Sequence, residues 1–217
     1  KRQEMVGAPK KVLIFSLAYY PNDVSGAEIA IKEITDRISR NAIEFHLVSL
    51  RYNSALPKTE QVGNVLVHRI GITKSSVTSA DLGKLPLHLN KPLFQFLAPL
   101  KALQLHKKYQ YDAIWSLMAH SSGVPAALFK LFHSKVPYIL TLQEGDPPEY
   151  IERVMTPLWP LFVRSFTQAT IVQSISNFLG AWARRRGFSG PLEIIPNGVD
   201  TKYFSEKIPR EALDRIK

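Results

Sequence analysis

Three polar side chains near the middle of the chain are candidates for hydrogen-bonding or acid–base chemistry. Gln143, Glu144 and Asp146 follow an apolar run at residues 137–142, in a segment that also holds one glycine and two prolines. Loops held by a rigid scaffold commonly carry binding residues. The carboxylates could accept hydrogen bonds from sugar hydroxyls, and one could act as a base if its pKa were raised. The alternative is a pair of ordinary solvated loop carboxylates.

A second loop, residues 20–28, has the composition of a phosphate-binding helix start. Gly26 opens an amphipathic helix, and Ser25 with Glu28 forms a capping-box pattern. Backbone N–H groups and the positive helix end could receive a phosphate there. Neither G-x-G-x-x-G nor a Walker sequence is present, which disfavours a dinucleotide-binding dehydrogenase and a P-loop enzyme. The alternative is a capped helix start without a ligand.

His120 is the one histidine of six that is expected near the carboxyl end of a strand. It is a candidate polar contact for a ligand, and the alternative is a structural or exposed histidine. The histidines are scattered without ligand spacing, so no metal site is predicted. No G-x-S-x-G nucleophile elbow occurs, which gives a hydrolase triad little support. The catalytic residues stay unassigned.

The elements that would position these residues are strands alternating with helices. Continuous apolar runs are typical of strands buried on both faces of a parallel sheet. Parallel neighbours need crossovers, so the pattern predicts a doubly wound, Rossmann-like α/β sheet of about seven strands, with helices on both faces. Ligands bind outside the carboxyl ends of such strands. The expected strands are residues 11–18, 45–50, 65–70, 112–116, 137–142, 169–173 and 192–195.

The segment 86–109 is helical in pattern, and Pro92 and Pro99 leave open whether it forms one helix or two. Its mixture of lysines and large apolar residues suggests contact with an anionic membrane surface, with a solvated helix face as the alternative. The residues involved are Lys91, Lys101, Lys107 and Lys108 with Leu93, Phe94, Phe96 and Leu97.

The composition limits the compartment and the partners. Of the 217 residues 45% are hydrophobic and none is cysteine, so a sizeable core is possible and disulfides are excluded. No run of eighteen apolar residues occurs, so we expect no membrane span and a cytoplasmic location, with peripheral contact at the inner face of the membrane left open. The net charge of +10 favours anionic partners, but nucleic-acid-binding motifs are absent and nucleic acid is not expected.

Near the end of the chain a strand at residues 192–195 is followed by Pro196, Asn197 and Gly198. Proline ends the ladder of a strand and Asn-Gly tolerates positive φ, so a sharp turn is predicted. Together with the rest of the chain, this turn indicates a hinge between a domain at residues 1–200 and a linker that begins at 201–217. The second domain would be absent. An ordinary surface turn is the alternative.

The order of these features resembles the N-terminal, acceptor-binding domain of retaining GT-B glycosyltransferases of the family four type, over nearly the whole chain. Two positions depart from the family pattern: Ser25-Gly26 stands where Gly-Gly is frequent, and Gln143 stands where histidine is frequent. Glutamine orients a hydroxyl but does not exchange a proton near neutral pH. The matching segments are Tyr20-Pro21, Ser25-Gly26-Ala27-Glu28, Asp112-Ala113-Ile114 and residues 137–142, 171–176 and 195–200, before Phe204.

The resemblance implies transfer of a sugar from a nucleotide-sugar donor to a glycan or lipid-linked acceptor, with retained anomeric configuration and without metal or other cofactor. Gly26 is carried over as a donor-phosphate contact, and Gln143, Glu144, Asp146 and His120 are the candidates for acceptor contact. The donor would be held mainly by the absent domain, so the chain alone is expected to be inactive. The alternatives are a membrane-surface or sugar-binding module without activity and a nucleotide-sugar epimerase of GT-B architecture.

Overall fold

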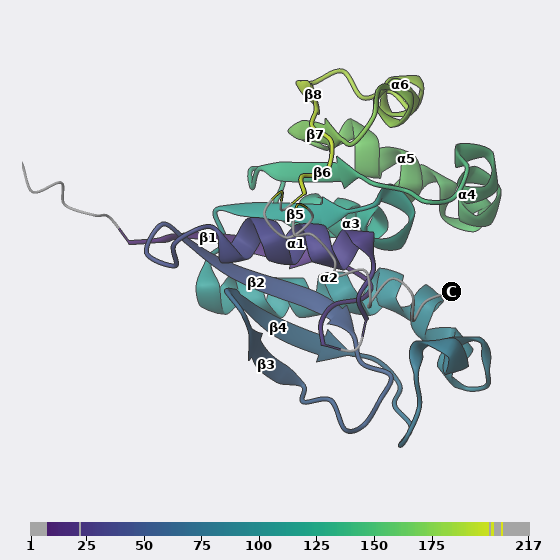
Figure 1. The fold of residues 1–217 in the computed structure, drawn as a ribbon. Helices are drawn as coiled ribbons and strands as arrows, with labels where there is room; N and C mark the ends of the chain where they lie inside the picture. Colours follow the sequence, from purple (N-terminus) through teal and green to yellow (C-terminus); the bar gives the residue numbers. More distant parts are fainter. Residues whose placement is uncertain (1–7, 22, 200, 202–204, 206–217) are drawn as a thin grey trace, which may run out of the picture.

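The chain forms an eight-stranded α/β sheet (Figure 1), described by a computed structural model for residues 8–21, 23–199, 201 and 205. The strand order is β3-β4-β2-β1-β5-β6-β7-β8, and every neighbouring pair is parallel except β3 and β4. The parallel strands therefore end at one edge, to the right in Figure 1. The strands are β1 Lys10–Phe15, β2 Ile43–Leu50, β3 Thr59–Val62, β4 Val65–Ile70, β5 Ala113–Leu117, β6 Tyr138–Leu142, β7 Ile171–Ser174 and β8 Leu192–Ile194.

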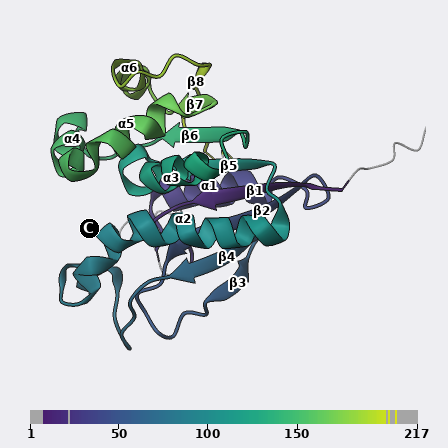
Figure 2. The same cartoon turned by 180° about the vertical axis from the view of Figure 1, so that it is seen from behind.

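Helices cover both faces of the sheet, which confirms the predicted doubly wound fold. On one face α1 packs in a core that contains Ile14, Ile31 and Leu47. On the opposite face, seen in Figure 2, α2, α3 and α5 pack in a larger core that contains Phe129 and Phe162. The helices are α1 Gly26–Asp36, α2 Asn90–Tyr109, α3 Val124–Phe132, α4 Pro148–Met155, α5 Trp159–Thr167 and α6 Asn177–Arg185.

The sheet has one strand more than the sequence indicates. β3 pairs antiparallel with β4 through a tight turn in which Gly63 has a φ of 54°. Its residues, Thr59–Val62, are mostly polar and lie at the edge of the sheet, so they show neither the apolar run nor the alternation that predicts a strand. A hairpin at a sheet edge needs only backbone pairing and a glycine that accepts positive φ.

Segment 90–109 is one helix, which settles the question left open by its two prolines. Pro92 falls in the first turn of α2, where the missing N–H costs nothing. Pro99 lies inside the helix and costs roughly 3 kcal/mol. Phe94 and Leu105 are buried on either side of it, and their burial contributes about 1.5–3 kcal/mol each, which offsets that cost.

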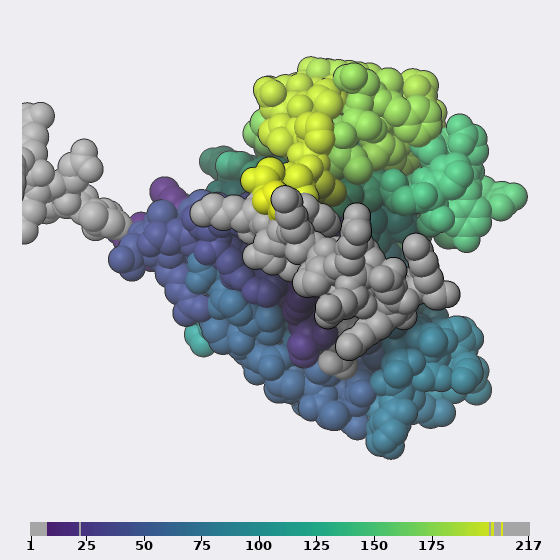
Figure 3. All heavy atoms as spheres, viewed as in Figure 1, coloured from purple at the N-terminus to yellow at the C-terminus, as the bar shows by residue number. Residues whose placement is uncertain are grey.

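The helices α4 and α5 are separated by a 3₁₀ turn at Thr156–Leu158. At the end of the sheet, β8 stops at Ile194, and the Ile195 N–H donates to the Ser174 carbonyl at 2.9 Å. Pro196, Asn197 and Gly198 follow as exposed, irregular chain. Figure 3 shows these residues, in yellow, at the molecular surface.

Their role as a hinge and the domain boundary at residue 200 stay predictions. Asp200 and most of the proposed linker, 202–204 and 206–217, lie outside the described residues.

Candidate functional site

Three loops meet at the carboxyl edge of the sheet, because β1, β5 and β6 are neighbours there. Gly26 starts the helix after β1, His120 lies in the loop after β5, and Gln143, Glu144 and Asp146 follow β6. These five residues are called the edge cluster below. All of them were candidates from the sequence, and the topology places them where ligands bind in this fold class.

Gly26 and Gln143 are close to each other although they lie far apart in the sequence. A Cβ at Gly26 would be 3.7 Å from Gln143 Nε2, an ordinary van der Waals distance, and Gly26 is exposed. The Ser25 N–H donates to Glu28 Oε2 at 2.8 Å, as the capping-box pattern predicts. The helix start is therefore capped, and a larger residue at position 26 would fit the protein but reduce the space for a ligand.

Glu144 is the buried member of the edge cluster and joins two loops. The Ala119 N–H donates to its Oε1, whereas its Oε2 is buried and has no hydrogen-bond partner among the described residues. Burial raises the pKa of Glu144 to about 7, and hydrogen bonds from backbone N–H groups oppose the rise. This carboxyl group can therefore exchange a proton near neutral pH, as a carboxylate that acts as a base must do.

His120 and Asp146 occupy the same edge with different exposure. Asp146 is exposed, whereas His120 is half-buried, and its Nδ1 has no hydrogen-bond partner in the described part of the chain. Burial lowers the pKa of His120, Asp146 acts in the opposite direction, and Lys91 adds to the lowering. A neutral imidazole with one unsatisfied nitrogen can donate to or accept from a ligand hydroxyl.

Gln95 supports the loop that carries His120, and it was not predicted as part of the site. From α2, its Nε2 donates to the Ser121 carbonyl at 3.2 Å and to the His120 carbonyl at 3.4 Å. Its Oε1 is buried without a partner among the described residues. A glutamine within an apolar helical run is the only sequence signal for this role.

The same loop has an unusual backbone. Met118 has a φ of 65°, in a region that non-glycine residues rarely adopt, and a π-helical turn at Ala119–Gly123 leads into α3. A Cβ at Gly123 would lie only 2.7 Å from Ser165 Cβ, so glycine is needed for the approach of α5. Strained backbone and π turns are frequent at functional sites. Nothing in the residue type of Met118 indicates this conformation.

The loop after β1 is anchored by residues that the sequence analysis did not single out. The Tyr52 hydroxyl hydrogen-bonds both carboxylate oxygens of Asp23 at 3.0 Å. Burial raises the pKa of Asp23, and this hydrogen bond opposes the rise. Arg69, itself buried, donates to the Tyr20 carbonyl at 2.8 Å and pairs with Glu60 at 2.7 Å. These contacts fix the approach of the chain to α1.

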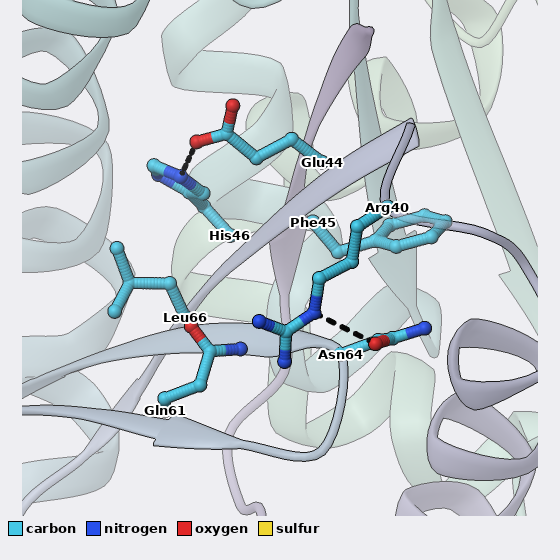
Figure 4. Close-up of a pocket in the computed structure, with 7 residues that line it drawn as sticks. All are labelled: Arg40, Glu44, Phe45, His46, Gln61, Asn64 and Leu66. Atoms are coloured by element: carbon cyan, nitrogen blue, oxygen red, sulfur yellow. Dashed lines mark hydrogen bonds and ion pairs between the residues drawn. The ribbon is translucent and has the colours of Figure 1, made fainter. Parts of the chain in front are cut away.

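Two cavities lie away from the edge cluster. One, of about 270 Å³, is at the start of β2 and β4 (Figure 4), where Arg40 Nε donates to Asn64 Oδ1 and Glu44 pairs with His46 Nε2, both at 2.8 Å. These polar groups satisfy one another. The second cavity lies beside α2. In the described part of the chain no three His, Asp or Glu residues are grouped to hold a metal, and metal-independent chemistry stays a prediction.

Comparison with known proteins identifies the family. The profile described as Glycosyltransferase Family 4 matches residues 24–203. The chain belongs to this family. The resemblance proposed from the sequence is therefore confirmed. No curated protein sequence matches the chain.

Solved structures of similar fold include two sugar-phosphate synthases. Sucrose-phosphate synthase from Thermosynechococcus elongatus has a TM-score of 0.62 at 14% identity, over 89% of this chain and 49% of its own. The trehalose-6-phosphate structure from E. coli with bound UDP-2-fluoro glucose has a TM-score of 0.56 at 14% identity, over 95% and 54%. An α,α-trehalose-phosphate synthase (UDP-forming) from Burkholderia vietnamiensis has a TM-score of 0.52 at 16% identity, over 89% and 49%.

This Family 4 chain thus has the Rossmann-like fold of GT-B glycosyltransferases, and it spans about half the length of these three structures.

Proposed function

We propose that this Family 4 chain is the acceptor-binding half of a retaining glycosyltransferase, which moves a sugar from a nucleotide-sugar donor to a glycan or lipid-linked acceptor. The observation that supports this most is the edge cluster: the exposed Asp146 and the half-buried Gln143 and His120 lie with a buried carboxyl group, whose pKa is about 7, at the carboxyl edge of the sheet. The E. coli structure of the same fold holds a nucleotide-sugar analogue, UDP-2-fluoro glucose, which supports a nucleotide-sugar donor.

Each member of the edge cluster has a role in this proposal. Gln143 and Asp146 hydrogen-bond acceptor hydroxyls, and the half-buried His120 lies at the same edge as a further polar contact. Glu144 holds the loop after β5 through its hydrogen bond from the Ala119 N–H. Gly26 allows the donor phosphate to approach the start of α1, where the first N–H groups have no intrahelical partner.

We expect the isolated chain to bind acceptors and to transfer no sugar, because the donor would be held mainly by a second half. The purified chain and the longer protein, obtained by reading the coding sequence past Lys217, are incubated with labelled nucleotide sugars and a panel of acceptors. Transfer by the longer protein alone supports the proposal. Transfer by the isolated chain would overturn the division of the site, and acceptor-independent interconversion of nucleotide sugars would favour the epimerase.

Gly26→Val in the longer protein is expected to raise the KM for the donor roughly tenfold or more, because a branched side chain blocks hydrogen bonds to a charged phosphate. The fold should be preserved, since a Cβ at this position meets only Gln143 Nε2 at 3.7 Å. Steady-state kinetics with varied donor measure the change. Gly83→Val is the matched control, because a Cβ there meets nothing within 4 Å. Unchanged donor KM in a folded Gly26→Val variant would remove Gly26 from the site.

A peripheral membrane module is the second candidate, and the exposed face of α2 favours it. Leu93, Phe96 and Leu97 are exposed on that helix, as the sequence hypothesis requires. Phe94 is 1% exposed and belongs to the core, so its assignment to this face was wrong. The hypothesis is that this face rests on anionic lipid while the edge cluster receives a lipid-linked acceptor. No described helix is long and apolar enough to cross a membrane, and cytoplasmic location stays a prediction.

The triple variant with glutamine in place of Lys91, Lys107 and Lys108, which are exposed, tests this contact. Each lysine near an anionic surface contributes about 1 kcal/mol, so vesicle affinity should fall roughly a hundredfold at low salt. Cosedimentation with anionic and neutral vesicles measures it. The control replaces the exposed Lys58, Lys74 and Lys135, which changes the net charge equally. If both variants bind alike, these three lysines make no specific contact with anionic lipid.

A further inference from the structure

The second cavity, of about 300 Å³, lies between α2 and the β3–β4 hairpin and is separate from the edge cluster. Its volume is that of a small ligand site. Its polar lining includes Lys101, Gln104 and Lys108 from α2, with Thr59 and His68 from the hairpin.

The secondary structure explains why these side chains converge. Lys101, Gln104 and Lys108 are spaced i, i+3 and i+7, so they share one face of α2. Thr59 and His68 are directly paired across the antiparallel β3–β4 ladder, so their side chains leave the same face of the hairpin. Helix face and hairpin face line the same cavity.

The two lysines of the cavity, Lys101 and Lys108, are not ion-paired with any carboxylate of the described residues. The Lys101 ammonium donates to Gln104 Oε1 at 3.1 Å, and the Lys108 ammonium lies 4.8 Å from the centre of the Tyr109 ring. His68 Nε2 is buried and has no hydrogen-bond partner in the described part of the chain. Burial lowers the pKa of His68 to about 4, and His46, Lys101 and Lys108 add to the lowering. An anion here would relieve that repulsion.

We propose that the cavity between α2 and the β3–β4 hairpin binds a phosphate monoester, held by Lys101 and Lys108. Two ammonium groups match the two negative charges of the dianion, and the Gln104 amide and the Thr59 hydroxyl supply further donors. The same α2 helix holds the loop of His120 through Gln95, at the opposite end from Lys108. The phosphate group could belong to a small metabolite or to a lipid headgroup.

Inorganic phosphate is the first probe, titrated at pH 7.5 and constant ionic strength against chloride, with the ring signals of His68 followed by NMR. We expect a saturable shift and a rise in the pKa of His68. The double variant Lys101→Gln, Lys108→Gln should bind phosphate roughly a hundredfold more weakly, about tenfold for each charge-assisted contact. The control is the double variant Lys91→Gln, Lys107→Gln, whose lysines do not line the cavity. It should bind phosphate as the wild type does.

Vesicles distinguish the two sources of the phosphate group. Binding to phosphatidic acid but not to phosphatidylglycerol or phosphatidylcholine, competed by inorganic phosphate, assigns the cavity to a monoester headgroup. Phosphate binding without vesicle binding assigns it to a soluble metabolite. The proposal is overturned if the His68 signals do not saturate beyond the chloride control, or if the variant at positions 101 and 108 binds phosphate as the wild type does. Neither outcome depends on glycosyl transfer.

Discussion

The Glu144→Gln substitution is expected to change the free energy of unfolding by about 3 kcal/mol more favourably at alkaline pH than at acidic pH. Burial raises the pKa of Glu144 from 4.5 to about 7, and a tenfold change in a proton-binding constant corresponds to about 1.4 kcal/mol. The contribution of the Glu144 carboxyl group to the stability of the wild type is fully present below pH 4.5 and is lost as the pH rises through 7, because this group ionises less readily in the folded state than in the unfolded state. Glutamine cannot ionise, and its oxygen can still accept from the Ala119 N–H.

Urea unfolding of both proteins between pH 4.5 and 8.5 measures this difference. Glu149→Gln is the matched control, because Glu149 is an exposed carboxylate at the start of α4 in the same loop region. It removes an exposed carboxylate and leaves the buried Glu144 in place. Parallel curves for the wild type and the Glu144→Gln variant would show that Glu144 titrates as a solvated carboxylate, and its proposed place in the site would fail.

When the pH falls from 7.5 to 4, the wild type is expected to lose about 3 kcal/mol of unfolding free energy that the His68→Gln variant keeps. The pKa of His68 is lowered from 6.5 to about 4, chiefly by burial. The unfolded state therefore binds more protons between those values, so the wild type loses stability as the pH falls below 6.5. The groups that face His68 are His46 on β2 and Lys101, Lys108 and Tyr109 on α2. No acid among these contacts opposes the effect.

The variant comparison is essential because Glu144 and His68 titrate with opposite sign over overlapping pH ranges. In the wild type their two contributions largely cancel, so the total stability curve conceals both. Burial also lowers the pKa of His46 and of His106, and these residues are unchanged in the variant. His88→Gln, at an exposed histidine, is the control. If the plots of unfolding free energy against pH run parallel for His68→Gln and the wild type, His68 is exposed to water and the cavity beside α2 does not shield it.

Most of the sheet was readable from local pattern. The predominantly apolar runs that form β1, β2, β4, β5, β6 and β7 follow from their burial between helices on both faces of the sheet. β3 was missed because an edge strand is selected by pairing with β4, not by its own composition. Whether α2 was continuous depended on the burial of Phe94 and Leu105 around Pro99, which no local rule reports.

The members of the edge cluster were also predictable, because a parallel sheet gathers the loops that follow its strands at one edge. Gly26, His120, Gln143, Glu144 and Asp146 were each named from residue type and position in such a loop. Residues that support the site from elsewhere were not. Gln95 acts on the His120 loop across 25 residues of sequence, and the conformation of Met118 has no counterpart in its residue type.

The sequence by itself therefore determined the class of fold, the family and the edge at which polar groups gather, because these depend on periodicity and on the order of elements. Only the tertiary structure decided what those groups are chemically. A carboxyl group at position 144 becomes a proton-exchanging group near pH 7, and His68 stays neutral beside two lysines, because burial and neighbouring charge set their pKa values. Both causes arise from residues brought together by folding, and their distance along the chain hides them from any local pattern.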